Sequence, residues 1–201
     1  MEVMKLLKEQ TRANHDSVEK YAHSHRIMDG SLTLEQYKEL VLKHFCFHRL
    51  LEGLASRVLT PEQAAKLDFE NRKKTALLRK DLEVLGISEQ DISVNFDNIT
   101  YSINSFEELL GALYVAEGST LGGAVIKRKL LQNPETAGVP MHFYGCYGEN
   151  IGTMWKSFIM NVVMAADSQE KSMTMVNKAK ETFEFFEYIL KNARTELKAV
   201  A

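Results

Sequence analysis

A run of glycines inside an otherwise helical segment, residues 114–127 (YVAEGSTLGGAVIK), constrains this fold more than any other feature. The run begins and ends as an amphipathic helix, yet Gly118, Gly122 and Gly123 lie in its middle. Each of them costs roughly 1 kcal/mol relative to alanine in a helix interior. Such a cluster indicates that the helix bends there, or that something large and flat approaches its backbone closely. Because the patch offers no charged side chains for catalysis, its occupant would bring its own chemistry.

The composition predicts one all-α domain over residues 1–201, because only three prolines interrupt a chain rich in Leu, Lys and Glu that is 45% hydrophobic. A net charge of -2 argues against a nucleic-acid partner. The two cysteines, Cys46 and Cys146, lack metal-ligand spacing and are typical of a reducing cytoplasm. No signal peptide and no stretch of 18 uninterrupted apolar residues is visible. We therefore expect a cytoplasmic monomer that does not enter a membrane.

Periodicity and capping signals predict six main helices and no convincing strands, which is the pattern of a helical bundle. The expected helices cover about residues 2–25, 33–58, 60–85, 105–131, 149–166 and 169–197. Capping boxes at Thr33 and Thr60 start the second and third of these, and Gly86 suits the position after the third. Asp167 is expected to open the last helix. The stretches 93–104 and 133–147 are predicted loops, and the second is long enough to carry function.

Two groups of histidines could bind a metal. His15 lies one helical turn before Glu19, and a carboxylate can fix the tautomer of a histidine that binds iron. His44, His48 and Glu52 follow one another at steps of four residues and could form half of a di-iron site. Both groups are also compatible with ordinary helix positions. Three further histidines carry no persuasive pattern: His23, His25 and His142.

Familiar catalytic motifs are missing from the sequence. The Gly118-Ser119 pair lacks the strand–turn–helix context of a hydrolase nucleophile, and GSTLGG has neither the P-loop nor the dinucleotide-binding spacing.

Taken together, these segments resemble the heme oxygenases, in particular the bacterial biliverdin-producing enzymes, including those associated with phytochromes. Residues 7–15 (LKEQTRANH) are similar to the family's first helix, whose histidine is the proximal heme ligand. Residues 114–123 are similar to the helix that covers the opposite, distal face of the heme. Trp155-x-x-Phe158 and the segment 179–185 fit later helices of the same fold. The resemblance implies a helical bundle with heme between the proximal helix and a kinked, glycine-rich distal helix.

The resemblance also implies roles for individual residues. His15 would ligate the heme iron, with Glu19 as its hydrogen-bond acceptor. A flat apolar disc with two carboxylates needs a slot between helices and polar groups at its edge. Lys8, Tyr114 and Lys156 are the candidates for that edge. The catalytic distal helix would organise water and allow a close approach to heme through Gly118, Ser119, Gly122 and Gly123.

The implied activity is oxidative cleavage of heme b to biliverdin with release of CO and iron, so that heme is both cofactor and substrate. O2 and electrons must come from outside, since no flavin or NAD motif is visible. Ferredoxin, flavodoxin or a reductase would supply the electrons, and a phytochrome could accept the bilin. Two alternatives stay open at this point: a heme carrier without turnover, and a non-heme di-iron oxygenase on a related helical scaffold.

The sequence departs from the animal-type enzymes at two positions. Their distal Asp corresponds to Ser119 here, as in the bacterial branch, and the one nearby carboxylate is Glu117. We therefore expect water held by backbone groups around Gly118 to Gly122 to take over its role. Met160 stands where some relatives have an arginine near the propionates, so the pattern does not specify which biliverdin isomer forms.

Overall fold

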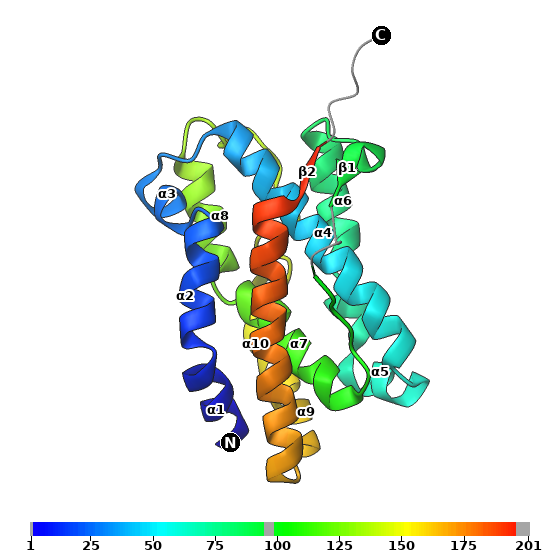
Figure 1. The fold of residues 1–201 in the computed structure, drawn as a ribbon. Coiled ribbons are helices and arrows are strands. Elements are labelled where there is room, and N and C mark those ends of the chain that lie inside the picture. The colour runs from blue at the N-terminus through cyan, green and yellow to red at the C-terminus, as the bar shows by residue number, and fades with distance from the viewer. Residues whose placement is uncertain (1, 95–98, 196–201) are drawn as a thin grey trace.

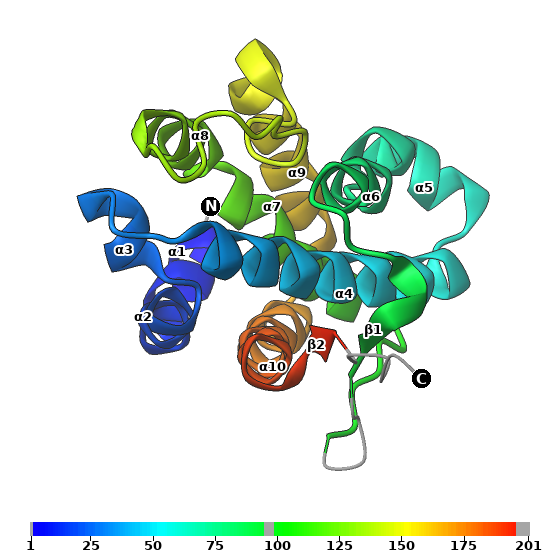
Figure 2. The same ribbon diagram turned by 90° about the horizontal axis from the view of Figure 1, so that it is seen from above.

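The computed structural model describes residues 2–94 and 99–195, which form an almost entirely helical bundle (Figures 1 and 2). Its α-helices are α1 (Glu2–Gln10), α2 (Arg12–Tyr21), α3 (Ser24–Asp29), α4 (Leu34–Val58), α5 (Pro61–Leu67), α6 (Thr75–Val84), α7 (Phe106–Thr120), α8 (Gly123–Gln132), α9 (Ile151–Ala165) and α10 (Gln169–Asn192). Short 3-10 helices cover Phe69–Arg72, Glu89–Asp91 and Gly148–Asn150. The predicted all-α class is confirmed.

The centre of the bundle is the crossing of α7 with α10, with α4 packed against both. Leu109, Leu110 and Ala112 of α7 are completely buried there. At Gly111 the two backbones approach so closely that an added Cβ would lie 2.2 Å from the carbonyl oxygen of Met175. Figure 2 shows α4 running across the bundle, with α10 on one side and α5, α6, α8 and α9 on the other. This packing leaves α1 and α2 as an outer wall.

The expectation of one helix over residues 2–25 is wrong, because the segment divides into α1, α2 and α3. At Thr11 the side-chain hydroxyl donates to the carbonyl of Leu7 at 2.7 Å, and the backbone leaves the helical region with φ -102° and ψ 2°. His23 adopts a left-handed conformation with φ 56° before α3 begins. A threonine hydroxyl that bonds the preceding turn commonly bends a helix, and this bend tilts α1 relative to α2.

The third predicted helix also divides, although its capping box at Thr60 and the one at Thr33 are confirmed. Asp68 is left-handed with φ 52°, and a 3-10 turn follows in which Phe69 and Arg72 are buried. Burial of these two side chains outweighs the helix propensity of the segment. Gly86 has the positive φ, 71°, expected after a helix end.

The last helix begins at residue 169, as predicted, but its capping residue is Ser168 and not Asp167, because the Ser168 hydroxyl accepts from the backbone N–H of Lys171. It ends at Asn192 because the chain then enters β2 (Arg194–Thr195), which pairs with β1 (Ile92–Ser93) in an antiparallel ribbon. The expectation of no strands is corrected to this extent. Residues 196–197 of the predicted helix and residues 95–98 of the predicted loop lie outside the described residues.

One segment is long and apolar enough to cross a membrane by those two criteria alone, namely Phe106–Gln132, which comprises α7 and α8. Of its most apolar stretch, 56% is buried inside the bundle, as in the core helix of a folded domain.

Candidate functional site

The glycine run bends the distal side of the bundle, as predicted. α7 ends at Thr120 and α8 begins at Gly123, and near this end the hydroxyls of Ser119 and Thr120 donate back to the carbonyls of Ala116 and Glu117, at 2.7 and 2.6 Å. None of the run's glycines has a positive φ. Their backbone conformation therefore does not require glycine. We attribute these glycines to the space that a missing side chain leaves beside the helix.

That space is a cavity of about 690 Å³ between α1 and α2 on one side and α7 and α8 on the other. α4 and α10 close its inner end with aromatic side chains, and Phe143, Tyr144 and Trp155 add to the wall. A Cβ on Gly118 would meet nothing within 4 Å, and one on Gly122 would meet only the end of Ile126, at 3.9 Å. The bare backbone of these two glycines thus widens a largely apolar slot.

Gly123 has a different environment. It is buried and is not among the residues that line the cavity, and an added Cβ would lie 3.3 Å from the backbone nitrogen of Gly145. Its lack of a side chain admits the neighbouring loop. Ser119 lines the cavity, but its hydroxyl proton is engaged by the carbonyl of Ala116 within the helix.

His15 lies at the rim of the cavity with a half-exposed side chain. Its Nδ1 atom is 3.9 Å from a Glu19 oxygen and 3.8 Å from an Asp16 oxygen, and the edge of its ring faces Phe183 with a centroid distance of 6.0 Å. Both nitrogen–oxygen distances are longer than a direct hydrogen bond, so Glu19 can contact the imidazole only through water or after a small side-chain rotation. The two carboxylates leave the other ring nitrogen available for a metal.

Cationic and hydroxyl groups gather at the same rim. Lys8 and Arg12 are one helical turn apart on either side of the Thr11 bend, and both line the cavity. Burial raises the pKa of Tyr114, and a hydrogen bond with Thr11 opposes that rise. Lys156 is exposed on α9 and is not among the lining residues, and Met160 on the same helix is 64% exposed. Sequence reasoning missed Arg12, which the one-turn spacing from Lys8 could have suggested.

His44 and His48 line the inner end of the cavity, whereas Glu52 does not. The Glu52 carboxylate accepts from the backbone N–H groups of Lys74 and Thr75, at 2.6 and 3.0 Å, and so caps the start of α6. Within the described residues, the one group of three potential metal ligands is His15, Asp16 and Glu19. The arrangement gives the di-iron alternative no support.

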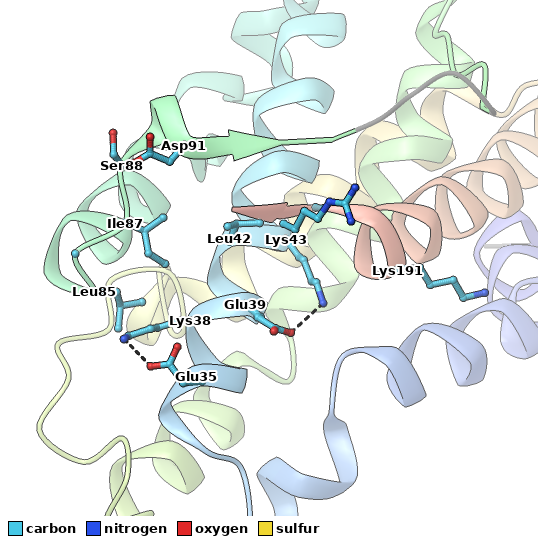
Figure 3. Close-up of a pocket in the computed structure, with 13 residues that line it drawn as sticks. Glu35, Lys38, Glu39, Leu42, Lys43, Leu85, Ile87, Ser88, Asp91 and Lys191 are labelled. Carbon is cyan, nitrogen blue, oxygen red and sulfur yellow. Dashed lines mark hydrogen bonds and ion pairs between the residues drawn. The ribbon is translucent and has the colours of Figure 1, made fainter. Parts of the chain in front are cut away.

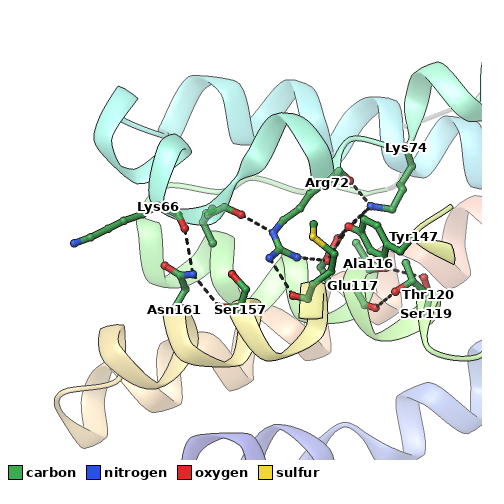
Figure 4. Close-up of polar contacts among 12 residues, drawn as sticks. Lys66, Arg72, Lys74, Ala116, Glu117, Ser119, Thr120, Tyr147, Ser157 and Asn161 are labelled. Carbon is green, nitrogen blue, oxygen red and sulfur yellow. Dashed lines mark hydrogen bonds and ion pairs between the residues drawn. The ribbon is translucent and has the colours of Figure 1, made fainter. Parts of the chain in front are cut away.

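Glu117, next to Gly118, belongs to a buried ionic cluster outside the cavity (Figure 4). Its carboxylate accepts from the Arg72 guanidinium, from Lys74 Nζ at 3.3 Å and from the Tyr147 hydroxyl at 2.8 Å. Burial and this carboxylate together raise the pKa of Tyr147. Arg72 also donates to the carbonyl of Met154 at 3.1 Å. The cluster ties α7 to α9 and to the segment before α6, so Glu117 braces the distal helix.

The loop between α8 and α9 is held by a second buried carboxylate. Asp81 on α6 accepts from the backbone N–H groups of His142 and Phe143, at 2.7 and 2.9 Å, and lies 2.7 Å from the His142 ring nitrogen Nδ1. The loop thereby places the rings of Phe143 and Tyr144 in the cavity wall. The predicted functional loop contributes to the site through these aromatic rings.

A second hollow of about 600 Å³ lies between α4, the end of α6 and the end of α10 (Figure 3). Charged side chains dominate it, and two of its lysines are paired along α4, Lys38 with Glu35 at 2.7 Å and Lys43 with Glu39 at 3.4 Å. Such a surface does not suit a flat apolar ligand.

Fold and site together define a class of helical proteins that hold a large flat ligand between a histidine-bearing helix and a bent, side-chain-poor helix. The sequence matches the model of the heme oxygenase family over residues 1–192. The chain therefore belongs to the heme oxygenase family, and it is an enzyme of that family.

Solved structures with the same fold include three bacterial heme oxygenases. That of Neisseria meningitidis, in NO- and CO-bound forms, is 22% identical with a TM-score of 0.71, over 94% of this chain and 90% of that one. That of Leptospira interrogans is 15% identical with a TM-score of 0.71, over 94% and 98%. Heme oxygenase-1 of Synechocystis, in complex with heme, is 15% identical with a TM-score of 0.69, over 95% and 91%. A comparison with curated protein sequences found no match.

Proposed function

We propose that this heme oxygenase cleaves heme b to biliverdin with release of CO and iron, and that His15 is the proximal iron ligand. The observation that supports the proposal best is that His15 and the Cβ-free backbone of Gly118 and Gly122 line one cavity. A porphyrin is a wide disc, and only a slot whose wall lacks side chains admits it close to a helix. Bound heme supplies the site for O2 activation and is also the molecule that is cleaved.

The residues of the chain bind and orient this substrate. The His15 imidazole would ligate the iron, and Glu19 would fix its tautomer through the other nitrogen. Lys8, Arg12 and Tyr114 would meet the propionates at the rim, where compact cations suit exposed carboxylates. Lys156 would take part only after a movement of its long side chain. The aromatic side chains at the inner end of the cavity would exclude bulk water from bound heme.

The distal helix would set which edge of the ring can react. Gly118 and Gly122 let the backbone approach the ring, and Ser119 adds a hydroxyl oxygen as an acceptor for water. Electrons would come from ferredoxin, flavodoxin or a reductase, and a bilin acceptor such as a phytochrome would take the product. A cytoplasmic location and a monomeric state complete the proposal.

The test measures both the ligation of the heme iron and the conversion of heme to bilin. Hemin is titrated into the wild type, His15→Ala and His48→Ala, and the Soret and visible bands are followed. Only His15→Ala should lose the histidine-ligated spectrum, and imidazole added to that variant should restore it. The wild-type complex is then given a reductase system and O2, and the bilins are separated by chromatography.

Biliverdin from the wild type supports the proposal. A Soret band that persists without any bilin would instead indicate a heme carrier, and a His15→Ala spectrum identical to that of the wild type would remove the axial assignment.

A further inference from the structure

Three potential metal ligands meet on α2, in the outer wall of the bundle (Figure 1). They are a ring nitrogen of His15 and one carboxylate oxygen each of Asp16 and Glu19, and the three atoms lie within 4.8 Å of one another. The Nδ1 atom of His15 is 3.8 Å from the Asp16 oxygen and 3.9 Å from the Glu19 oxygen. The part of the chain that the structure describes contains no other group of this kind.

The donor set and its geometry suit a divalent transition-metal ion. Imidazole nitrogens and carboxylate oxygens bind such ions at about 2.0–2.2 Å, so that two ligands of one ion lie about 3–4 Å apart. Both distances from Nδ1 of His15 fall in this range. The side chains of Asp16 and Glu19 are 60% and 54% exposed, so they can rotate toward each other around an ion, and water can complete its coordination.

The three residues share the cavity with the substrate of the proposed function. All of them line it, and among the described residues Asp16 and Glu19 are the only carboxylates that do. The proposed reaction frees one iron, which His15 holds until the tetrapyrrole has opened. The two carboxylates beside this imidazole are therefore the anionic ligands nearest to the iron when it is released.

One neutral imidazole cannot serve heme and such an ion at the same time, because it carries one proton and one free lone pair. When Nε2 of His15 ligates heme iron, the proton is on Nδ1 and faces the carboxylate of Glu19. When Nδ1 ligates an ion between the two carboxylates, the proton is on Nε2, which then has no lone pair for heme. Heme and the ion thus exclude each other.

We propose that His15, Asp16 and Glu19 form a site for one divalent cation in the heme-free protein, and that this site receives the iron released from heme. The second part rests on the proposed function, and the first does not. The transfer is a ligand exchange without change of oxidation state. Bonds from iron to Nε2 and to the nitrogens of the opened tetrapyrrole break, and bonds to Nδ1 and two carboxylate oxygens form. The external electron donor supplies the electrons that keep the iron divalent.

The first test needs no heme. Mn2+ is titrated into the apo-protein, and electron paramagnetic resonance follows the loss of the signal of the free ion. The wild type should bind one Mn2+, and His15→Ala, Asp16→Asn and Glu19→Gln should each weaken binding about tenfold or more. The matched control is Asp29→Asn, which removes the same charge from a carboxylate 3.0 Å from His25 Nδ1 on α3 and should keep the wild-type affinity.

Two results of this titration would overturn the site. One is the absence of Mn2+ binding by the wild type. The other is equal weakening in Asp29→Asn, because general charge attraction would then explain the binding. The three ligand side chains are all more than half exposed, so each variant should keep the wild-type urea midpoint, and a loss of binding then reports the site and not the fold.

The second test measures the mutual exclusion. Hemin is titrated into the wild type at increasing Mn2+ concentration, and its apparent Kd should rise in proportion to the occupancy of the Mn2+ site. In Asp16→Asn the same Mn2+ concentrations should leave the hemin Kd of that variant unaltered. Hemin affinity of the wild type that does not change at saturating Mn2+ would overturn the shared use of His15.

The third test follows the iron itself. In a single turnover of the heme complex, a chromogenic ferrous chelator should detect iron later than biliverdin appears, and Asp16→Asn should shorten this delay. Equal delays in the two proteins would overturn the role of the site as iron acceptor. Failure of the wild type to form biliverdin would contradict the proposed function, while the Mn2+ titration would still decide whether the cation site exists.

Discussion

Two adjacent residues of α7, Glu117 and Gly118, face opposite environments. The Glu117 side chain is 2% exposed, and two cations and a phenol surround its carboxylate. Gly118 presents bare backbone to a cavity in which an added Cβ would meet nothing within 4 Å. One face of the helix is thus fully paired and packed, and the other is left open. The comparison shows that the packed face holds the helix in place, while the open face leaves room for a ligand.

Breaking the packed face should have the largest effect. Glu117→Gln leaves Arg72 and Lys74 buried without their carboxylate, which should destabilise the fold by about 3–5 kcal/mol. Urea unfolding of the apo-protein measures this change. Glu135→Gln, at an exposed glutamate after α8, is the control and should change stability by less than about 0.5 kcal/mol. Equal midpoints for the two variants would show that the ionic cluster does not brace α7.

Acid should act on the buried histidines of α4, which line the same cavity as Gly118. The unfolded pKa of histidine is near 6.5 and the folded pKa of His44 is about 4, so the unfolded chain binds more protons as the pH falls through this window. The free energy of unfolding should therefore be highest above pH 6.5, and His44 alone should lower it by roughly 3 kcal/mol as the pH falls toward 4. Unfolding midpoints of the wild type and of His44→Phe, measured across this range, test the prediction. His25→Asn, at a side chain that is 91% exposed, should keep the wild-type slope.

A methyl group at Gly111 tests a glycine of the same helix in a third environment, because Gly111 packs against backbone and not against a cavity. The Cβ of Gly111→Ala would lie 2.2 Å from the Met175 carbonyl oxygen, so α7 and α10 must separate. We expect a loss of about 1–3 kcal/mol, as in other overpacked cores, measured by thermal or urea unfolding. A variant as stable as the wild type would mean that the crossing is looser than the structure indicates.

The same methyl group at Gly118 should have the smallest effect on stability and the opposite sign. Gly118→Ala fits the cavity and the helical backbone, so a gain of about 0.4–1 kcal/mol is expected in the apo-protein. Gly118→Leu should keep the apo-protein folded but weaken hemin binding, because its side chain enters the slot. Hemin titration and apo-protein unfolding separate the two effects. Unaltered hemin affinity in Gly118→Leu would contradict a close approach of the ligand to α7.

Local signals in the sequence predicted the start of several elements and the residues at the rim of the site. The capping boxes at Thr33 and Thr60 and the turn at Gly86 depend on neighbouring residues only, and each is confirmed. His15 and Tyr114 could be singled out by motif, and both line the cavity. The break at Thr11 was missed because the Thr11 hydroxyl bonds the carbonyl of the preceding turn, and the break at Asp68 because burial of Phe69 and Arg72 outweighs helix propensity.

By itself, the sequence determined the helical class and the bend at residues 118–123, since these follow from helix propensity and glycine content. Its resemblance to the heme oxygenases supplied the candidate iron ligand, His15. Only the tertiary structure decided which glycine faces the cavity and which packs against a loop, as Gly122 and Gly123 show. It also assigned Glu117 and Glu52 to bracing and capping, and His44 and His48 to the cavity wall. The physical reason is that the role of a polar side chain depends on its partners, and these come from segments far away in the chain.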